Sequence, residues 1–115
     1  KCLSDAILVT GFPYNVAENP LQCIDQFATV VGKGLPVRRL GSAALDLAYT
    51  AAGRFDAFWE SVLQPWDMAA GVLMVQEAGG RVTHYSSAPF ELSTNSIIAS
   101  NGHIHVELSA LLELK

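Results

Sequence analysis

A helix that is apolar on nearly every face constrains the fold of this chain more than any other feature. Pro65 fixes φ just before it, and Asp67 falls where the helix should begin. The residues that follow are almost all apolar through Val75, and Gly79 and Gly80 then provide a left-handed C-terminal stop. A helix with this composition does not lie on a surface, so we expect it to be buried.

Two carboxylates flank the start of this helix, Glu60 and Asp67. Asp67 is first of all a candidate N-cap, since Asp is common at that position. Alternatively it also holds a hard divalent cation such as Mg²⁺, which takes one or two carboxylates besides water and phosphate oxygens. Glu60 ends the preceding predicted strand, where it is solvated, ion-paired or directed into a pocket. One carboxylate does not make a metal site, so the spacing leaves these interpretations open.

Short apolar strands alternate with helical segments along the chain. Strands are predicted at 6–10, 37–40, 54–60, 81–83 and 96–100, and helices at 20–31, 43–52, 67–78 and 103–114. The helix that opens at Pro20 should bury Leu21, Ile24, Phe27, Ala28 and Val31. This order predicts an α/β layered domain, with a mostly parallel or mixed sheet of about five strands and flanking helices. We expect residues 1–115 to form a single domain.

Residues that could bind a ligand lie where predicted strands pass into helices. Gly41, Ser42 and Ala43 lead from one strand into a helix, and Ser42 is a good N-cap. Helix N-termini carry unpaired N–H groups, and open α/β sheets bind ligands at the carboxyl ends of their strands. We therefore expect this turn, Glu60 and Asp67 to share one pocket. Each residue also keeps a plain structural explanation, as a capped turn or a solvated acid.

Several short segments together resemble the inositol monophosphatase family. Trp-Asp-Met-Ala-Ala-Gly at 66–71, followed by Glu-Ala-Gly-Gly at 77–80, is similar to the C-terminal signature of that family. Arg-Leu-Gly-Ser-Ala-Ala at 39–44 and Phe-Trp-Glu at 58–60 resemble other family segments, at the separations expected. The similarity extends from about Leu8 to the end of the chain. It implies the C-terminal half of the inositol monophosphatase/fructose-1,6-bisphosphatase-like fold.

The resemblance also implies an activity and roles for particular residues. The family hydrolyses polyol and sugar phosphates with Mg²⁺ and is typically lithium-sensitive. Asp67 would bind one metal ion and touch a substrate hydroxyl, and Glu60 would accept a hydrogen bond from the polyol. The turn formed by Gly41, Ser42 and Ala43 would line the substrate pocket. All five residues are therefore predicted to bind substrate, with Asp67 also a metal ligand.

The first signature of the family does not occur in these 115 residues. That signature is an Asp-Pro-hydrophobic-Asp-Gly-Thr segment with an upstream Glu-Glu pair, and it supplies most of the metal ligands. The groups that activate water and hold the phosphate are expected in this absent N-terminal half. We therefore assign no catalytic residue here and expect the isolated chain to be inactive.

The expected function is that of the C-terminal part of a Mg²⁺-dependent inositol-1-monophosphatase. Fructose-1,6-bisphosphatase, histidinol-phosphatase and 3′-phosphoadenosine phosphatase are alternatives within the class. A noncatalytic oligomerisation or partner-binding module that keeps the fold is an alternative of another class. The low charged fraction of 16% and the Arg38-Arg39 pair favour that alternative, because arginine suits a subunit contact as well as a phosphate contact. The resemblance suggests a homodimer.

Composition limits the partners and the compartment. A net charge of −4 argues against nonspecific nucleic-acid binding, which needs clustered Lys and Arg. No apolar run approaches the length of a membrane span. Cys2 and Cys23 lack metal-ligand or redox spacing, which favours free thiols in a reducing compartment, and we expect a cytoplasmic protein. His84, His103 and His105 also lack metal-ligand spacing, so we expect them on the surface or in loops.

Overall fold

The computed structural model describes residues 3–61, 63, 65–85 and 96–112. Its central layer is a five-stranded sheet in the order β2-β1-β3-β5-β4. The strands are β1 (Leu8–Thr10), β2 (Val37–Arg38), β3 (Ala57–Ser61), β4 (Arg81–Thr83) and β5 (Ser96–Ser100). β1 runs parallel to β2 and β3, whereas β5 runs antiparallel to β3 and β4. The predicted α/β domain with a mixed sheet of about five strands is confirmed.

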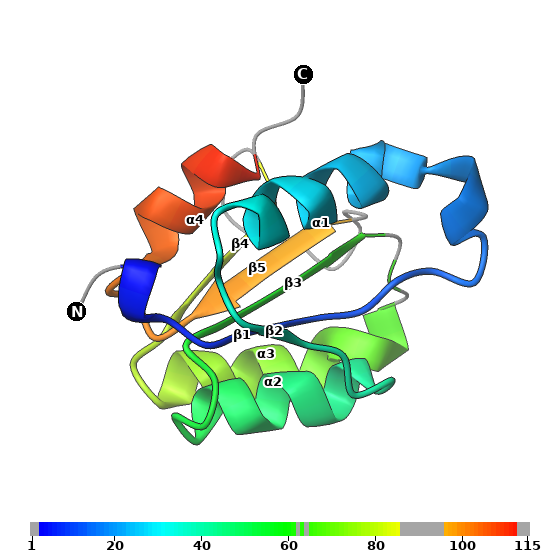
Figure 1. Ribbon diagram of the computed structural model, residues 1–115. Coiled ribbons are helices and arrows are strands. Elements are labelled where there is room, and N and C mark those ends of the chain that lie inside the picture. The colour runs from blue at the N-terminus through cyan, green and yellow to red at the C-terminus, as the bar shows by residue number, and fades with distance from the viewer. Residues whose placement is uncertain (1–2, 62, 64, 86–95, 113–115) are drawn as a thin grey trace.

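Helices cover both faces of this sheet (Figure 1). α2 (Ala43–Ala51) and α3 (Pro65–Glu77) lie side by side on one face. α1 (Cys23–Gly32) and α4 (His105–Leu111) lie on the other. Three single turns of 3₁₀ helix occur at Leu3–Asp5, Val16–Glu18 and Pro20–Gln22. The chain therefore forms three layers, with the sheet between two pairs of helices.

Successive side chains of each strand feed two separate cores, because they point to opposite faces of the sheet. On the side of α1 and α4, Leu8, Trp59 and Ile98 belong to one buried cluster. On the side of α2 and α3, Val9 and Phe58 belong to the other. Glu60 shares the alternation of Phe58, so β3 directs its carboxylate towards the α2 and α3 side.

Helix α3 is only half covered, which corrects the expectation that it is buried all round. Met68, Val72 and Val75 are buried against the sheet. In contrast, Leu73 is 57% exposed and Met74 is 43% exposed, although both are apolar. Composition predicted burial for every side of this helix, but the described residues cover only the sides that face the sheet and α2.

Helix α1 begins later than expected and buries a different face. Leu21 and Gln22 have positive φ angles of 51° and 60°, so regular helix does not extend back to Pro20. The buried residues of α1 are Cys23, Gln26 and Val30. Four residues expected in the core are instead exposed: Leu21, Ile24, Ala28 and Val31. The prediction failed because the break in the backbone changes which side of the helix meets the sheet.

The last helix is also shorter than predicted, and it buries a histidine. His105 is 0% exposed, with Nδ1 2.7 Å from Ser100 Oγ and Nε2 2.8 Å from Thr83 Oγ1. Burial lowers the pKa of His105 to about 4. The expectation of a surface histidine is wrong at this position, because the first turn of α4 lies against β4 and β5. His103 is exposed, as expected.

Some of the remaining predictions agree with the structure and others do not. β3 begins at Ala57 and not at residue 54, whereas β4 and β5 have the predicted bounds. Cys23 is a free, buried cysteine, and Cys2 lies outside the described residues together with most of the predicted excursion at 85–89. Within the described ranges, none of the helices combines the length and apolarity that crossing a bilayer requires.

Candidate functional site

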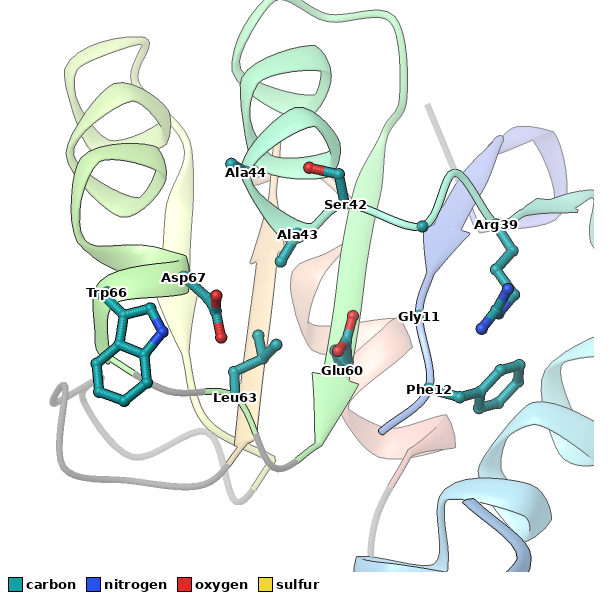
Figure 2. Close-up of a pocket in the computed structure, with 11 residues that line it drawn as sticks. Gly11, Phe12, Arg39, Ser42, Ala43, Ala44, Glu60, Leu63, Trp66 and Asp67 are labelled. Atoms are coloured by element: carbon teal, nitrogen blue, oxygen red, sulfur yellow. The ribbon is translucent and has the colours of Figure 1, made fainter. Parts of the chain in front are cut away.

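A pocket of about 410 Å³ opens where the first turns of α2 and α3 approach the ends of β1 and β3 (Figure 2). Its volume falls within the range of roughly 300–1,000 Å³ typical of small-molecule sites. All five residues predicted to share a pocket line it: Gly41, Ser42, Ala43, Glu60 and Asp67. Further lining residues are Gly11, Phe12, Arg39, Ala44, Leu63 and Trp66. The structure thus brings the predicted residues together, and their roles stay predictions.

The turn before α2 presents backbone donors to this pocket. Gly41 has a φ of 85°, in the left-handed region where a side chain would be strained. Ser42 caps α2, because the Leu45 N–H donates to Ser42 Oγ over 3.3 Å. The first N–H groups of an α-helix lack partners within the helix. Ala43 and Ala44 are the first two residues of α2 and line the pocket, so their N–H groups are candidates to bind an oxygen of a ligand.

Glu60 is the buried acid of the pocket. It is only 8% exposed, and its carboxylate points into the cavity (Figure 2). Gly11, which follows β1, makes room for it, since a Cβ atom on Gly11 would overlap Glu60 Oε1. Burial raises the pKa of Glu60 to about 7, with further increases from the charges of Asp46 and Asp67 and a partial decrease from Arg39. Near neutral pH both the protonated and the ionised form of its carboxyl group are therefore populated, so it can donate or accept a hydrogen bond.

Asp67 lies inside the first turn of α3, two residues after the helix begins at Pro65. The N-cap interpretation is therefore wrong, because the fixed φ of proline suits the first helical position and moves the start earlier. The Asp67 side chain is half-buried and faces the same cavity as Glu60 (Figure 2). The positive end of the α3 dipole stabilises a carboxylate at this position.

A third carboxyl group, that of Asp46, was not predicted from the sequence. It is 0% exposed, one turn into α2, and neither of its oxygens has a hydrogen-bond partner among the described residues. Burial raises the pKa of Asp46 to about 6. The signal that could have found it is a single acid within the apolar run Ala-Ala-Leu-Asp-Leu-Ala at 43–48.

Arg39 and Phe12 form the wall of the pocket beyond Glu60, and the sequence had not placed them there. The Arg39 guanidinium carbon lies 5.5 Å from the centroid of the Phe12 ring. Phe12 in turn meets Phe27 of α1 edge-on, with ring centroids 5.2 Å apart. Arg38 does not line the pocket, so the two adjacent arginines have different surroundings.

The described residues do not complete a metal site. Among them, no group of three or more His, Cys, Asp or Glu side chains is arranged to hold a metal ion. Carboxylate oxygens such as those of Asp67 are the ligands that Mg²⁺ takes, usually with water and phosphate oxygens. Asp67 therefore fits one position of a magnesium site, but the residues described here do not form the rest of it.

Comparisons with known proteins agree with this geometry. The sequence is 46% identical over 110 residues to the inositol-1-monophosphatase of Synechocystis sp., covering 96% of this chain and 38% of that protein. It is 48% identical over 103 residues to the Nus factor SuhB of Pseudomonas aeruginosa, covering 88% and 38%. The structure of the inositol monophosphatase from Anabaena (Nostoc) superposes with a TM-score of 0.84 at 46% identity, covering 96% of this chain and 44% of that one.

This chain therefore spans less than half the length of the relatives it matches. The model of the inositol monophosphatase family matches it over residues 2–114, which is nearly its whole length. The same family residues, those of the Trp-Asp segment and of the Gly-Ser-Ala turn, line the pocket described above. The chain belongs to the inositol monophosphatase family, a family of phosphate monoester hydrolases.

Proposed function

We propose that this chain forms the polyol-binding part of a Mg²⁺-dependent phosphate monoester hydrolase that acts on inositol 1-phosphate. The observation that carries the proposal is that the Gly41–Ala43 turn, Glu60 and Asp67 converge on one pocket. These residues come from three separate stretches of the chain, so folding alone brings them together. Backbone N–H groups, a hydroxyl and carboxyl oxygens are the groups that bind the hydroxyls of a polyol.

In the proposed reaction, a water oxygen attacks the phosphorus atom of the monoester. A new P–O bond forms to that oxygen, and the P–O bond to the alcohol breaks. The leaving alkoxide takes up a proton, which gives the free polyol and inorganic phosphate. When bound, Mg²⁺ lowers the pKa of the attacking water and offsets charge on the phosphate oxygens.

The residues of this chain have binding roles in that scheme. Glu60 accepts a hydrogen bond from a polyol hydroxyl, and the turn at Gly41–Ala43 offers N–H groups to another. Asp67 holds one metal ion and contacts a hydroxyl of the substrate. None of these residues activates the water, so that group is assigned to another part of the protein.

The missing groups are proposed to arrive on a segment that packs against the outer face of α2 and α3. The apolar stripe of α3 on that face repeats at the helical spacing of i, i+3, i+4, i+7 and i+8: Trp66, Ala69, Ala70, Leu73 and Met74. An exposed apolar stripe of this kind is usually covered in the complete protein. The relatives are long enough to supply such a cover, since this chain spans only 38% of the Synechocystis protein. A homodimer in the reducing cytoplasm, consistent with the free thiol of Cys23, completes the proposal.

The proposed role of Asp67 is tested in the intact protein that contains this chain. Asp67→Asn should lose most of kcat, because it removes a metal ligand, whereas Ser42→Ala should mainly raise KM. Glu77→Gln is the matched control, since Glu77 is an exposed acid at the far end of the same helix. Kinetics of phosphate release from inositol 1-phosphate measure all three. An unchanged kcat in Asp67→Asn would mean that Asp67 only stabilises the start of α3.

The proposal that the water-activating group lies outside this chain is tested with the 115-residue chain alone. Its rate of Mg²⁺-dependent phosphate release should be close to background, and its affinity for Mg²⁺ should be weak, because it carries one proposed metal ligand. Turnover at an ordinary enzyme rate, roughly 1–1,000 s⁻¹, would contradict the proposal.

A second candidate function is a noncatalytic module for oligomerisation or partner binding. The exposed apolar stripe of α3 supports it. In addition, one of the relatives is named as a Nus factor and not as a phosphatase. The mass of the native polypeptide separates the two candidates. A native chain near 12.3 kDa would favour the module, and one as long as the relatives would favour the hydrolase.

A further inference from the structure

We propose that Tyr85 is a positioning residue for this pocket, because it bonds to the paired ends of β3 and β5 and thereby keeps the Glu60 carboxylate in place. Tyr85 does not line the pocket itself. The inference rests on the proposed function, since it explains how the polyol-binding role of Glu60 is supported. The juxtaposition that carries it is a buried tyrosine in contact with the last residue pair of the β3–β5 ladder, one residue beyond Glu60.

Glu60 lies on a part of β3 that has a strand neighbour on one side only. The pairing of β3 with β1 extends no further than Trp59. Beyond that residue, and within the described part of the chain, β3 pairs with β5 alone, through Glu60 and Ser61. The ends of strands open more readily than their centres. How firmly the backbone of Glu60 is held therefore depends on the last pair of this ladder, Ser61 and Ser96.

Tyr85 bonds to both members of that last pair. Its hydroxyl oxygen lies 2.8 Å from Ser61 Oγ, and its backbone N–H donates to Ser96 Oγ over 3.1 Å. Ser61 and Ser96 are directly opposite each other in the register. Since the strands are ordered β3-β5-β4 and Tyr85 lies two residues after β4, its side chain reaches across β5 to β3. One residue thus joins the ends of two strands.

These bonds are shielded from water, because Tyr85, Ser61 and Ser96 are all buried. Burial also raises the pKa of Tyr85 above its ordinary value of 10, so the hydroxyl keeps its proton near neutral pH. A buried hydroxyl that loses its partner costs more free energy than one that can turn to solvent. Removing the Tyr85 hydroxyl should therefore change how often the end of β3 opens.

The effect reaches Glu60 through the backbone of β3, since neighbouring side chains of a strand point to opposite faces. Tyr85 belongs to the core on the side of α1 and α4, whereas the Glu60 carboxylate points into the pocket on the other side (Figure 2). The space for this carboxylate is narrow, because even a Cβ atom on Gly11 would overlap it. A small displacement of the strand end therefore moves the carboxylate out of its place.

The test uses the intact protein and compares wild type with Tyr85→Phe, Ser61→Ala and the double variant. Phosphate release from inositol 1-phosphate with Mg²⁺ gives KM and kcat. Each single variant should raise KM about fivefold, the scale of one hydrogen bond, and leave kcat within about twofold, because Glu60 has a binding role. The double variant should raise KM no further than the single variants, since all three remove the same bond.

His105→Gln is the matched control for a loss of stability alone. The imidazole of His105 also joins β4 and β5 by buried hydrogen bonds, but it bonds to Ser100, at the opposite end of β5 from Ser96. This variant should lower Tm and leave KM unchanged. Tm of every variant is measured by calorimetry, so that an effect on KM is compared at a known loss of stability.

Hydrogen exchange of single backbone amides gives a readout that does not depend on hydrolysis. In Tyr85→Phe, exchange at Glu60 and Ser61 should become about fivefold faster. The change at Ala57 and Phe58 should be smaller, because β1 also pairs with those two residues. In His105→Gln, Glu60 and Ser61 should show no such selective increase.

Four results would overturn the inference. These are equal exchange at Glu60 in wild type and Tyr85→Phe, equal rises of KM in Tyr85→Phe and His105→Gln, a double variant whose rise is the product of the single rises, and an unchanged KM in Tyr85→Phe when Glu60→Gln raises it. An unchanged KM in Glu60→Gln itself would reject the proposed binding role of Glu60. The exchange rates would then still decide whether Tyr85 holds the end of β3.

Discussion

Gly11 leaves the space that the Glu60 carboxylate occupies in the pocket. A methyl group at position 11 would overlap Glu60 Oε1, so Gly11→Ala should displace that carboxylate from the pocket. We expect KM for the phosphate monoester to rise about tenfold in the intact protein, with a smaller change in kcat, because Glu60 has a binding role. Steady-state kinetics check this.

Gly32→Ala is the control for that substitution, since a Cβ atom at position 32 meets no atom within 4 Å. It should leave KM and kcat as they are. An unchanged KM in Gly11→Ala, together with a raised KM in Glu60→Gln, would mean that the carboxylate keeps its place when its neighbour grows.

Asp46 should limit the stability of the chain above neutral pH. Its folded pKa of about 6 exceeds the reference value of 3.8. The stability that it contributes when protonated is therefore present below pH 3.8 and lost as pH rises through 6. Asp46→Asn cannot ionise, so it should stabilise this chain by up to about 3 kcal/mol at pH 8.

Urea unfolding of wild type and Asp46→Asn at pH 8 and pH 4 measures this difference. The advantage of the variant should shrink towards zero at pH 4, where both side chains are neutral in the fold. A variant that is less stable at pH 8 would show that the ionised carboxylate is satisfied by a group absent from the described residues.

Among the elements, α4 is joined to the sheet by the hydrogen bonds of one imidazole as well as by the apolar packing of Leu108. His105 bonds to Ser100 of β5 and Thr83 of β4, and its pKa is lowered to about 4 from 6.5. A lowered pKa means that the neutral ring is favoured by folding, so its contribution is full above pH 6.5 and is lost as pH falls towards 4. Between pH 7 and pH 5 the loss should be about 2 kcal/mol.

This prediction is checked by urea unfolding of wild type and His105→Gln at both pH values. The variant should be less stable at pH 7 and should lose less stability than wild type on going to pH 5. The control His103→Gln changes an exposed histidine two residues away and should follow wild type. Parallel losses in wild type and His105→Gln would contradict the role of the imidazole.

The bounds of the strands and helices show which features the sequence pattern predicts and which it does not. The strands at 81–83 and 96–100 were predicted from their branched apolar residues, since a short apolar run can be read locally. The buried face of α1 was not predicted, because positive φ angles at Leu21 and Gln22 change where the helix begins. No residue type at those two positions signals a left-handed backbone.

At the scale of the whole molecule, the outer face of α2 and α3 is the feature that this chain leaves open. Leu73→Glu places a charge in the middle of the exposed apolar stripe. In the isolated chain it should hardly change Tm and should reduce self-association. In the intact protein it should lower Tm by several degrees, because a covered, unpaired charge costs several kcal/mol.

Val31→Glu is the matched control, since Val31 is an exposed apolar residue of α1 on the opposite face of the sheet. Differential scanning calorimetry and light scattering of both variants, in both forms of the protein, give the readout. Equal tolerance of Leu73→Glu in the intact protein would mean that nothing covers this face.

By itself, the sequence determined the class of fold, the family and the five residues expected to share a pocket. Those features depend on local periodicity and on short motifs, which are readable without knowing what packs against what. Only the tertiary structure decided that Asp46 is buried beside the pocket and that Arg39, but not Arg38, lines it. Only the tertiary structure also showed that one side of α3 is exposed. Burial and the surroundings of a charge depend on residues distant in sequence, and the physical consequences, such as the raised pKa of Glu60, follow from those neighbours.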